Sequence, residues 1–585
     1  MERAVTDVPP KNVDSRRALR RPWLLAVAAA PLLFVAYLLI SRQLGVNSDN
    51  ASNALQAREM LDGNLLLRGW TVTDVSFYTN ELLLFMLVEV VYGFHDDTTH
   101  ALAALVFTLL VLVVAFAAKG RATGREAALR VAVAVGIVAV PALGHAAITQ
   151  LTGPDHTGTA IPLLITWLVL ERYRPGLRWP RSLRSLGATG ARPGPSSSLR
   201  SSDRTSPAPG LGLPLVIAAL LAWAQIADPL VMYIGVLPLM LVCAVRAWRD
   251  RSWRGLDARL VLAGVGSVVL AQVALSLLRA AGGFGAHAAE AKLAAFTSLP
   301  SHLWLGLRVV AVNYGAYPPD RVNAADTLMS AVHLVGLLAA AAALVVVVAR
   351  ALRRRPGEPG DRLAELCAVA ILVNLGAFVV SALPTDLLSA RQVVAVLPLG
   401  AVLAGRVWGP RLAELSRQAR GRAVVPATAA VLALLGAELV GHAAAKGAPG
   451  HAVDVAEWLD DRGLHYGLGE YWNANNITLL TSGRVKVRPV VAGDRVAAYR
   501  WESKVDWYDA GAQDATFLVL DTRNPGSRAE AVATAQFGPP VERHEFNGAV
   551  VLVYGKDLLV GLPAYCVPEM VANIRDCPEH GVALF

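Results

Sequence analysis

Charged residues are scarce in this chain, and two common sequence patterns are missing. Only 17% of its 585 residues are charged, whereas about a quarter are charged in ordinary soluble domains. No unit of fixed length repeats along the chain. No glycine-rich phosphate loop is present either, because the stretch GLGEYW at 467–472 lacks the flanking strand and helix pattern. The composition therefore excludes an ordinary soluble domain, and the sequence predicts no nucleotide site.

The sequence predicts a polytopic α-helical membrane protein. Hydrophobic residues make up 55% of the chain, and they are concentrated in blocks of roughly 17–25 residues, the length that crosses the hydrocarbon core of a bilayer. Length and hydropathy predict about eleven transmembrane helices. They lie near 23–41, 101–118, 127–147, 158–171, 213–227, 230–247, 259–279, 326–349, 363–383, 392–407 and 424–442.

The distribution of arginine and lysine predicts the orientation. The N-terminal tail is basic, and so are alternate loops, among them the long loop 172–212. Basic loops stay in the cytoplasm, so an odd number of spans places the C-terminal part outside the plasma (inner) membrane. No small-residue cleavage site follows the first apolar run, which we interpret as a retained anchor. This topology accounts for the net charge of +9, and no nucleic-acid partner is predicted.

Three parts follow from this topology: a cytoplasmic tail (1–22), a membrane domain (23–442) and an outer domain (443–585). The membrane domain includes an outer loop, 42–100, whose apolar run 80–94 predicts a juxtamembrane helix. The cytoplasmic loop 172–212 is rich in Gly, Pro and Ser, so we expect it to be flexible. In the outer domain, VKVRPVVAG, ATFLVLDT and GAVVLVYG predict strands of a small α/β fold.

The four cysteines fall into two pairs. Cys566 and Cys577 lie in the tail of the outer domain, where either a disulfide or two free thiols fit the predicted compartment. Cys243 and Cys367 lie inside predicted spans, and we interpret them as small apolar residues.

Two acidic residues in outer loops are the candidates for chemistry. Asp49 follows the first span in NSDNASNALQAREMLDGNLLLRGW, and Asp155 lies in LTGPDHTGTA between the third and fourth predicted spans. Each carboxylate has a structural alternative, since Asp at a helix start commonly caps the helix. Acidic residues at membrane depth, however, usually face a cavity and mark function.

These segments resemble the GT-C superfamily of integral membrane glycosyltransferases, which includes protein O-mannosyltransferases, aminoarabinose transferases and arabinosyltransferases. SDNASNALQAREMLDGN resembles the family's first-loop motif, in which Asp49 takes the position of the catalytic Asp. Asp155, after Gly-Pro, resembles the second acidic site. Arg391, in the segment PTDLLSARQVVAVLPLG, takes the position of a late Arg that precedes a Pro-containing span. The chain departs from the family pattern at two places. Asn50 stands where many members have Glu or Asp. Before the second span, where members have a K-P-P-L run, this chain has FYTNELLLF (77–85), which contains Glu81.

The resemblance implies a sugar donor linked to a polyprenyl phosphate and an acceptor hydroxyl on a cell-envelope glycan, a lipid or a protein. Asp49 is the expected base, because a carboxylate in a partly apolar cleft can have its pKa raised toward that task. Asp155 is expected to orient the acceptor or to help bind a divalent metal, Mg²⁺ or Mn²⁺, for which Asp49, Asp155 and His156 are the candidate ligands. For His156 a purely structural role is the alternative. The sugar, a hexose or a pentose, is left open.

The leaving lipid phosphate needs a cation, and Arg391 is the first candidate because Arg binds phosphate in a bidentate manner. The outer loop 280–325 offers further bases, which are either donor-binding groups or snorkelling interfacial residues. Glu81 is a further candidate for donor binding. The loop bases assigned to donor binding are Lys292, Arg308 and Arg321.

A polar and aromatic cluster in the outer domain predicts weak acceptor or glycan binding. It contains Trp472, Asn473 and Asn475, residue types that stack on sugars and donate amide hydrogen bonds. A Trp core with Asn-capped turns is the alternative. For the whole protein, the other functional classes are a polytopic lipid or glycan transporter and a non-catalytic scaffold for envelope assembly.

Overall fold

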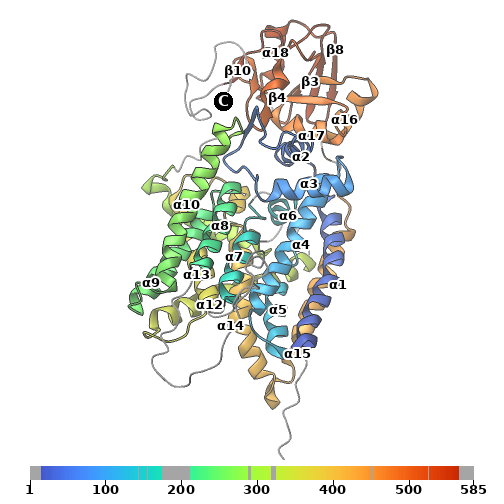
Figure 1. Cartoon of the computed structure of the whole chain (residues 1–585). Helices are drawn as coiled ribbons and strands as arrows, with labels where there is room; N and C mark the ends of the chain where they lie inside the picture. The colour runs from blue at the N-terminus through green and yellow to red at the C-terminus, as the bar shows by residue number, and fades with distance from the viewer. Residues whose placement is uncertain are drawn as a thin grey trace, which may run out of the picture.

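The computed structural model of the chain describes residues 15–141, 144–153, 156–173, 211–286, 292–317, 324–447, 450, 452–524 and 526–565. A helical bundle carries a sheet domain at one end (Figure 1). Four predicted site residues lie outside the described residues: Asp155, Arg321, Cys566 and Cys577.

Every predicted span overlaps a helix of the bundle. Six helices in the described part of the chain are long and apolar enough to cross a membrane, or seven if a bent pair counts as one span. The bundle helices are α1 (Ser15–Ser41), α4 (Thr98–Lys119), α5 (Gly124–Val138), α7 (Ala160–Arg172), α8 (Gly212–Ala227), α9 (Leu237–Arg249) with the π-helical turn η1 (Met232–Val236), α10 (Leu256–Ala280), α12 (Ala324–Arg353), α13 (Arg362–Val380), α14 (Val396–Leu415) and α15 (Val424–Ala444). The bent pair is α14 with the 3₁₀ helix η3 (Leu387–Val393).

The third predicted span, 127–147, is wrong at its end. Helix α5 stops at Val138, and the chain resumes as a separate short helix, α6 (His145–Leu151). Pro141 lies between them, and proline has no amide hydrogen to continue a helix and disfavours helical backbone before it. The predicted outer loop 280–325 contains the 3₁₀ helix η2 (Phe296–Ser298) and a further α-helix, α11 (Leu299–Asn313).

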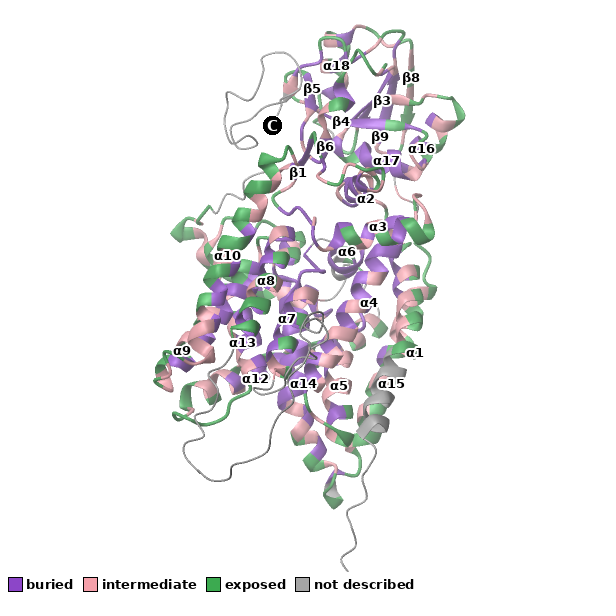
Figure 2. Cartoon of the chain, viewed as in Figure 1, coloured by how far each residue is buried: buried purple, intermediate pink, exposed green. Residues whose placement is uncertain are grey.

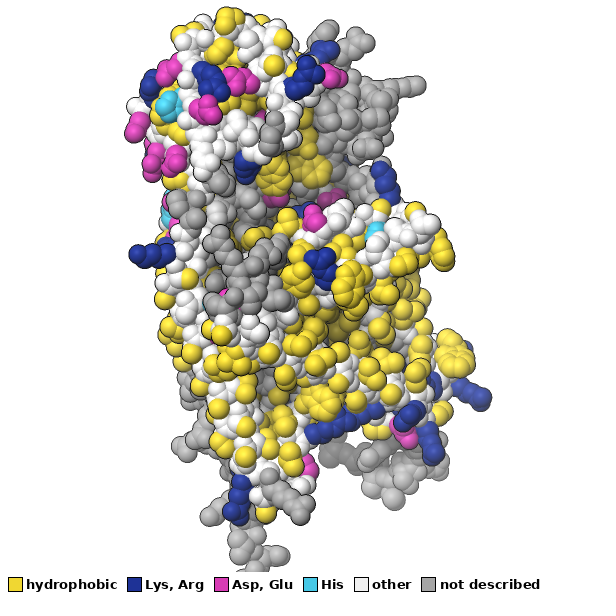
Figure 3. Space-filling model, turned by 180° about the vertical axis from the view of Figure 1, so that it is seen from behind, with side chains coloured by type: hydrophobic (Ala, Val, Ile, Leu, Met, Phe, Trp, Pro, Cys, Tyr) yellow, Lys and Arg dark blue, Asp and Glu magenta, His cyan; other side chains and the backbone are white. Residues whose placement is uncertain are grey.

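Helix α14 lies at the centre of the bundle, with nearly every residue from Val396 to Val407 buried (Figure 2). Its glycines permit close helix packing, since a Cβ at Gly405 would lie 2.5 Å from the carbonyl oxygen of Arg130 on α5. Hydrophobic side chains cover the outside of the bundle, whereas charged side chains gather on the sheet domain and at the opposite end (Figure 3). This distribution is the one expected of a membrane-embedded bundle.

The first outer loop forms a layer between the bundle and the sheet domain (Figure 1). It contains α2 (Ser48–Leu61), β1 (Trp70–Val72) and the predicted juxtamembrane helix, α3 (Glu81–Tyr92). Strand β1 pairs in parallel with β2 (Gly285–Ala286) and antiparallel with β6 (Ser503–Lys504). This three-stranded sheet joins two outer loops to the outer domain.

The C-terminal part of the chain, called the outer domain after its predicted location, is an α/β unit. Its seven-stranded sheet has the order β10-β5-β4-β3-β7-β9-β8, in which the central strands β4, β3 and β7 are parallel. The strands are β3 (Tyr466–Glu470), β4 (Lys486–Ala492), β5 (Val496–Tyr499), β7 (Phe517–Asp521), β8 (Glu542–Phe546), β9 (Ala549–Val553) and β10 (Ala564–Tyr565). The remaining helices in the described part of the chain are η4 (Ala419–Gly421), α16 (Ala452–Asp461), η5 (Tyr471–Asn473), α17 (Asn475–Leu480), η6 (Val505–Tyr508) and α18 (Ala529–Phe537).

Candidate functional site

Asp49 does not cap helix α2, contrary to the structural alternative for this residue. Asn47 is the N-cap, and its side-chain oxygen accepts a hydrogen bond of 2.9 Å from the backbone N–H of Asn50. Asp49 lies in the first helical turn, where the positive end of the helix dipole stabilises an anion. Its half-buried carboxylate is thus available for a different contact.

That contact comes from the outer domain. The hydroxyl of Tyr471, the first residue after β3, donates a hydrogen bond to Oδ1 of Asp49 and also contacts Oε2 of Glu502. Burial, followed by the charge of Asp49, raises the pKa of Glu502 well above its ordinary value. A protonated Glu502 donates to the Tyr471 oxygen, which leaves the single hydroxyl hydrogen of Tyr471 for Asp49.

The backbone of Glu502 is held in an unusual conformation. Its φ is +46°, in the left-handed region that non-glycine residues rarely adopt. The carbonyl oxygen accepts hydrogen bonds from Oγ of Ser52 (3.3 Å) and from Nδ2 of Asn475 (3.2 Å). Such conformations persist where the surroundings enforce them, and they cluster at functional sites.

Further contacts fix the outer domain on α2 and β1. The hydroxyl of Ser48 donates to the carbonyl oxygen of Tyr471. Lys504 of β6 forms an ion pair of 3.2 Å with Glu59, and Trp507 packs edge-to-face on Trp70 at 4.9 Å between ring centroids. The Tyr471 and Glu502 side chains are therefore positioned by a packed interface, so that Asp49 meets them in a defined geometry.

The second outer loop lies against the same helix. Nδ2 of Asn50 donates to the carbonyl oxygen of Thr152, and a Cβ at Gly153 would lie 1.7 Å from Oδ1 of Asn50. Glycine is therefore required for this close approach. Thus the loop that carries Asp155 contacts the residue next to Asp49, although Asp155 itself lies outside the described residues.

Glu81 and His156 belong to a buried polar cluster beneath this loop. Nδ1 of His156 lies 2.8 Å from Oδ2 of Asp228, and the hydroxyl of Thr159 donates to the same oxygen. Glu81 is only 1% exposed and packs against Gly158. Burial raises its pKa to about 8, with a smaller contribution from Asp228. Glu81 therefore carries a proton at neutral pH.

Within the described residues, neither oxygen of the Glu81 carboxyl group has a hydrogen-bond partner. The described residues also contain no group of three His, Cys, Asp or Glu side chains that could hold a metal ion. Of the three candidate ligands, Asp49 contacts Tyr471, and His156 contacts Asp228 instead of Asp49.

Arg391 lies in η3, the 3₁₀ helix that precedes α14, and it is exposed. Two hydrogen bonds tie this segment to α6: Gln150 donates to the carbonyl of Asn313 (2.8 Å), and Asn313 donates to that of Ala390 (2.8 Å). Thr152, which accepts the hydrogen bond from Asn50, directly follows α6. The segment that carries Arg391 is therefore held by the same short helix that leads to the Asn50 contact.

The other predicted donor-binding bases lie on neighbouring segments. Lys292 is exposed, and its carbonyl accepts a hydrogen bond from Ala382 after α13. Arg308 lies on α11, which packs against η3, and Nη2 donates to the Tyr317 hydroxyl at 2.8 Å. Neither side chain contacts Asp49, Tyr471 or Glu502 directly in the hydrogen bonds of the described residues.

Of the predicted acceptor-binding cluster, only one side chain reaches the surface. Trp472 is 50% exposed and packs edge-to-face on Tyr471, with ring centroids 5.1 Å apart. Asn473 and Asn475 are buried. Asn475 donates a hydrogen bond to the carbonyl of Glu502, so it supports the backbone of that residue.

Three site residues were missed by reasoning from the sequence: Tyr471, Glu502 and Asp228. Tyr471 directly follows a strand of a parallel sheet, at the edge where ligand sites usually form, and that position was readable. Glu502 carries no such signal. Asp228 precedes a proline at the end of a predicted span, but only the fold brings it to His156.

Comparison with known proteins finds matches among solved structures alone. No protein-family model and no curated protein match the chain. Among solved structures, ArnT from Cupriavidus metallidurans bound to undecaprenyl phosphate aligns with 91% of this chain and 98% of its own, at 16% identity and a TM-score of 0.48. The archaeal oligosaccharyltransferase AglB from Archaeoglobus fulgidus, in complex with an inhibitory peptide and a dolichol-phosphate, aligns with 86% of this chain and 71% of its own, at 14% identity and a TM-score of 0.45.

Proposed function

We propose that the protein is a glycosyltransferase that moves a sugar, a hexose or a pentose, from a polyprenyl-phosphate-linked donor to an acceptor hydroxyl. The reaction takes place at the outer face of the plasma membrane, and the acceptor is a cell-envelope glycan, a lipid or a protein. The observation that carries this proposal is the contact of the Asp49 carboxylate with Tyr471 at the junction of bundle and outer domain.

In the proposed reaction, the oxygen of the acceptor hydroxyl attacks the anomeric carbon of the sugar. Asp49 accepts the proton that this hydroxyl loses. The bond from that carbon to the phosphate oxygen breaks, and the polyprenyl phosphate leaves with the electron pair. Asp49 suits the role of base because the Tyr471 hydroxyl orients its carboxylate without neutralising it. General base catalysis of this kind contributes about 10²–10⁴-fold in rate.

Three further predicted residues, Arg391, Asp155 and Trp472, support this transfer step. Arg391 stabilises the charge on the leaving phosphate, for which a fixed guanidinium is well suited. Asp155 orients the acceptor or helps to hold a divalent ion, because its loop touches Asn50. Trp472 offers an exposed ring beside Tyr471 on which an acceptor sugar can stack.

The test compares two conservative variants of the purified protein, with synthetic polyprenyl-phosphate arabinose and mannose as donors. Asp49→Asn removes the proposed base, and Asp62→Asn makes the same chemical change at the other end of α2, where Asp62 pairs with Arg58 on the surface. We expect Asp49→Asn to lower kcat by at least about 100-fold while donor binding and the melting temperature are retained.

Asp62→Asn should leave kcat within about twofold of the wild-type value. If Asp49→Asn transfers sugar as fast as Asp62→Asn, Asp49 is not the base. If the wild-type protein transfers no sugar but moves labelled polyprenyl lipid across a bilayer, the transporter alternative replaces the transferase.

A further inference from the structure

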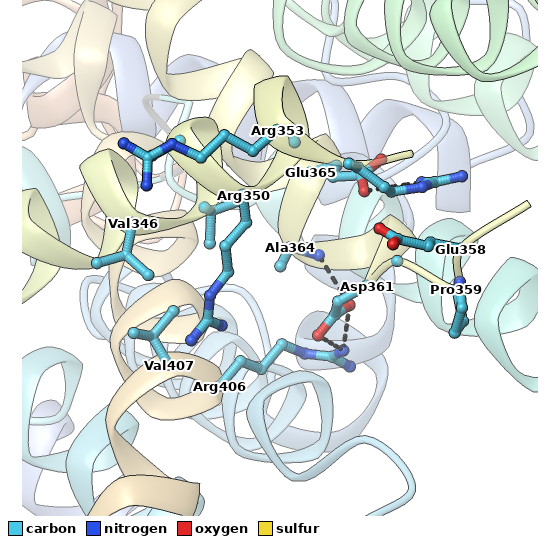
Figure 4. A pocket seen from close by; sticks show the side chains of 15 residues that line it. Val346, Arg350, Arg353, Glu358, Pro359, Asp361, Ala364, Glu365, Arg406 and Val407 are labelled. Atoms are coloured by element: carbon cyan, nitrogen blue, oxygen red, sulfur yellow. Dashed lines mark hydrogen bonds and ion pairs between the residues drawn. The ribbon is translucent and has the colours of Figure 1, made fainter. Parts of the chain in front are cut away.

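A cavity of about 620 Å³ opens at the end of the bundle opposite the outer domain. It lies between the last turns of α12, the start of α13 and the middle of α14 (Figure 4). Its volume is in the range of sites that hold small ligands or lipid headgroups. The predicted topology places this end of the bundle in the cytoplasm, because the loop between α12 and α13 is basic.

Arginine dominates the lining of the cavity. Two of the arginines are already paired: Arg406 with Asp361 (2.7 Å) and with Glu171 (2.7 Å), and Arg354 with Glu365 (3.2 Å). The third acidic residue of the lining, Glu358, accepts a hydrogen bond from a backbone amide, that of residue 355. The charged lining residues are Arg350, Arg353, Arg354, Arg406, Glu358, Asp361 and Glu365.

The other two arginines, Arg350 and Arg353, form no ion pair with any described residue and are exposed. Figure 4 shows the Arg350 side chain extending from α12 toward Val407 and Arg406 on α14. Since Asp361 and Glu365 are committed to other arginines, the cavity holds positive charge that its own acids do not balance. Such an arrangement favours an anion that can accept several guanidinium hydrogen bonds.

The chemistry of the walls indicates what carries the anion. Val346, Val347 and Val407 form an apolar side of the cavity, toward the membrane-spanning part of α12 and α14. A phospholipid presents a phosphate next to an apolar glycerol ester and acyl chain, and basic pockets between transmembrane helices on the cytoplasmic side bind anionic headgroups. We infer that this cavity binds the phosphate of an anionic phospholipid, a site separate from the proposed transfer site.

The test measures lipid retention on the full-length protein in detergent by native mass spectrometry, with phosphatidylglycerol and phosphatidylcholine as probes. We expect the wild-type protein to retain one phosphatidylglycerol in preference to phosphatidylcholine. The double variant Arg350→Gln/Arg353→Gln should bind phosphatidylglycerol about 30-fold more weakly, because each arginine near an anionic lipid contributes about 1 kcal/mol. Arg350→Lys/Arg353→Lys should recover most of the affinity.

A matched control makes the same change of charge at the same end of the bundle but outside the cavity: Arg411→Gln/Arg417→Gln on and after α14. It should retain phosphatidylglycerol like the wild type. A further measurement adds 10 mM inorganic phosphate as a competitor of phosphatidylglycerol. If the phosphate displaces the lipid, the site recognises the phosphate group alone. If the lipid stays bound, the site recognises the whole lipid headgroup. Equal retention of phosphatidylglycerol by the wild type and the Gln double variant, or equal retention of both lipids, overturns the inference, whatever the outcome for Asp49.

Discussion

The hydroxyl of Tyr471 donates a hydrogen bond to Oδ1 of Asp49 across 422 residues of sequence. The same hydroxyl contacts Glu502, and burial raises the pKa of this carboxyl group well above its ordinary value. The Tyr471 hydroxyl has a single hydrogen to donate, and the raised pKa of Glu502 favours a proton on Glu502, which leaves the Tyr471 hydrogen for Asp49. The Tyr471 hydroxyl therefore gives the Asp49 carboxyl group a defined orientation.

Replacing Tyr471 with Phe removes the hydroxyl and keeps the ring. We expect kcat to fall by about tenfold to 100-fold, because a misplaced catalytic group costs up to about 10² in rate. Two carboxyl groups lose a hydrogen-bond partner, so the free energy of unfolding should fall by about 1–3 kcal/mol. Steady-state kinetics with a saturating donor, together with thermal melts, measure both effects.

The control for this variant is Tyr508→Phe. The Tyr508 hydroxyl donates to the carbonyl of Pro489 at 2.6 Å, buried in the same domain but making no contact with Asp49. Tyr508→Phe should therefore lower the melting temperature of the protein without lowering kcat. If the two variants reduce kcat equally, the Tyr471 hydroxyl only stabilises the fold.

Glu81 makes the stability of the protein depend on pH. Its pKa rises from the ordinary value of 4.5 to about 8 on folding, so the folded state holds a proton that the unfolded chain releases. Between pH 4.5 and pH 8 this group therefore destabilises the fold as the pH rises, by at most about 1.4 kcal/mol per pH unit. We expect Glu81→Gln, which mimics the protonated form, to flatten the decline of the melting temperature over this window.

An exposed glutamate of the outer domain provides the comparison. Glu457→Gln, on α16, should reproduce the pH profile of the wild type. A Glu81→Gln profile parallel to that of the wild type would mean that Glu81 is ionised in the fold and has a cationic partner.

The sequence was sufficient to select Asp49 as a candidate, because the end of a span, a cap-type residue and an amphipathic helix follow one another locally. The outer-domain residues that lie against this helix could not be predicted from the local sequence. Contacts such as that of Ser52 with Glu502 join residues that are separated by 450 positions. The positive φ of Glu502 is also unreadable, because non-glycine residues adopt it only when tertiary contacts enforce it.

The membrane spans show the same division between local and non-local information. Apolar blocks of sufficient length revealed the helices, but averaging hydropathy over a window ignored Pro141, which ends α5 early and allows α6 to form. The strands of the outer domain were readable as short β-rich runs bounded by Gly, Asp and Asn, whereas the pairing of β1 with β6 depends on the docking of two distant segments.

Trp472 is expected to affect the acceptor more than the chemical step. Its ring is half exposed beside Tyr471, so Trp472→Ala removes a stacking surface and leaves Asp49 in place. We expect the KM for the acceptor to rise by about fivefold to tenfold at nearly unchanged kcat, corresponding to about 1 kcal/mol of uniform binding. Trp472→Phe, which keeps a ring, should recover most of the loss. A fall in kcat with unchanged KM would place Trp472 in the support of Tyr471.

Asn50 stands where the family pattern has an acid, yet the fold requires its amide. Nδ2 of Asn50 donates to the carbonyl of Thr152, and an aspartate at this buried position has no hydrogen to donate. We expect Asn50→Asp to lower the free energy of unfolding by about 2 kcal/mol and to reduce activity, because it leaves the Thr152 carbonyl without this donor and adds a charge beside Asp49. Asn50→Ala, which removes the donor without adding charge, should be less destabilising. Activity of Asn50→Asp above that of the wild type, appearing only with Mg²⁺ or Mn²⁺, would instead show that a second carboxylate completes a metal site at this position.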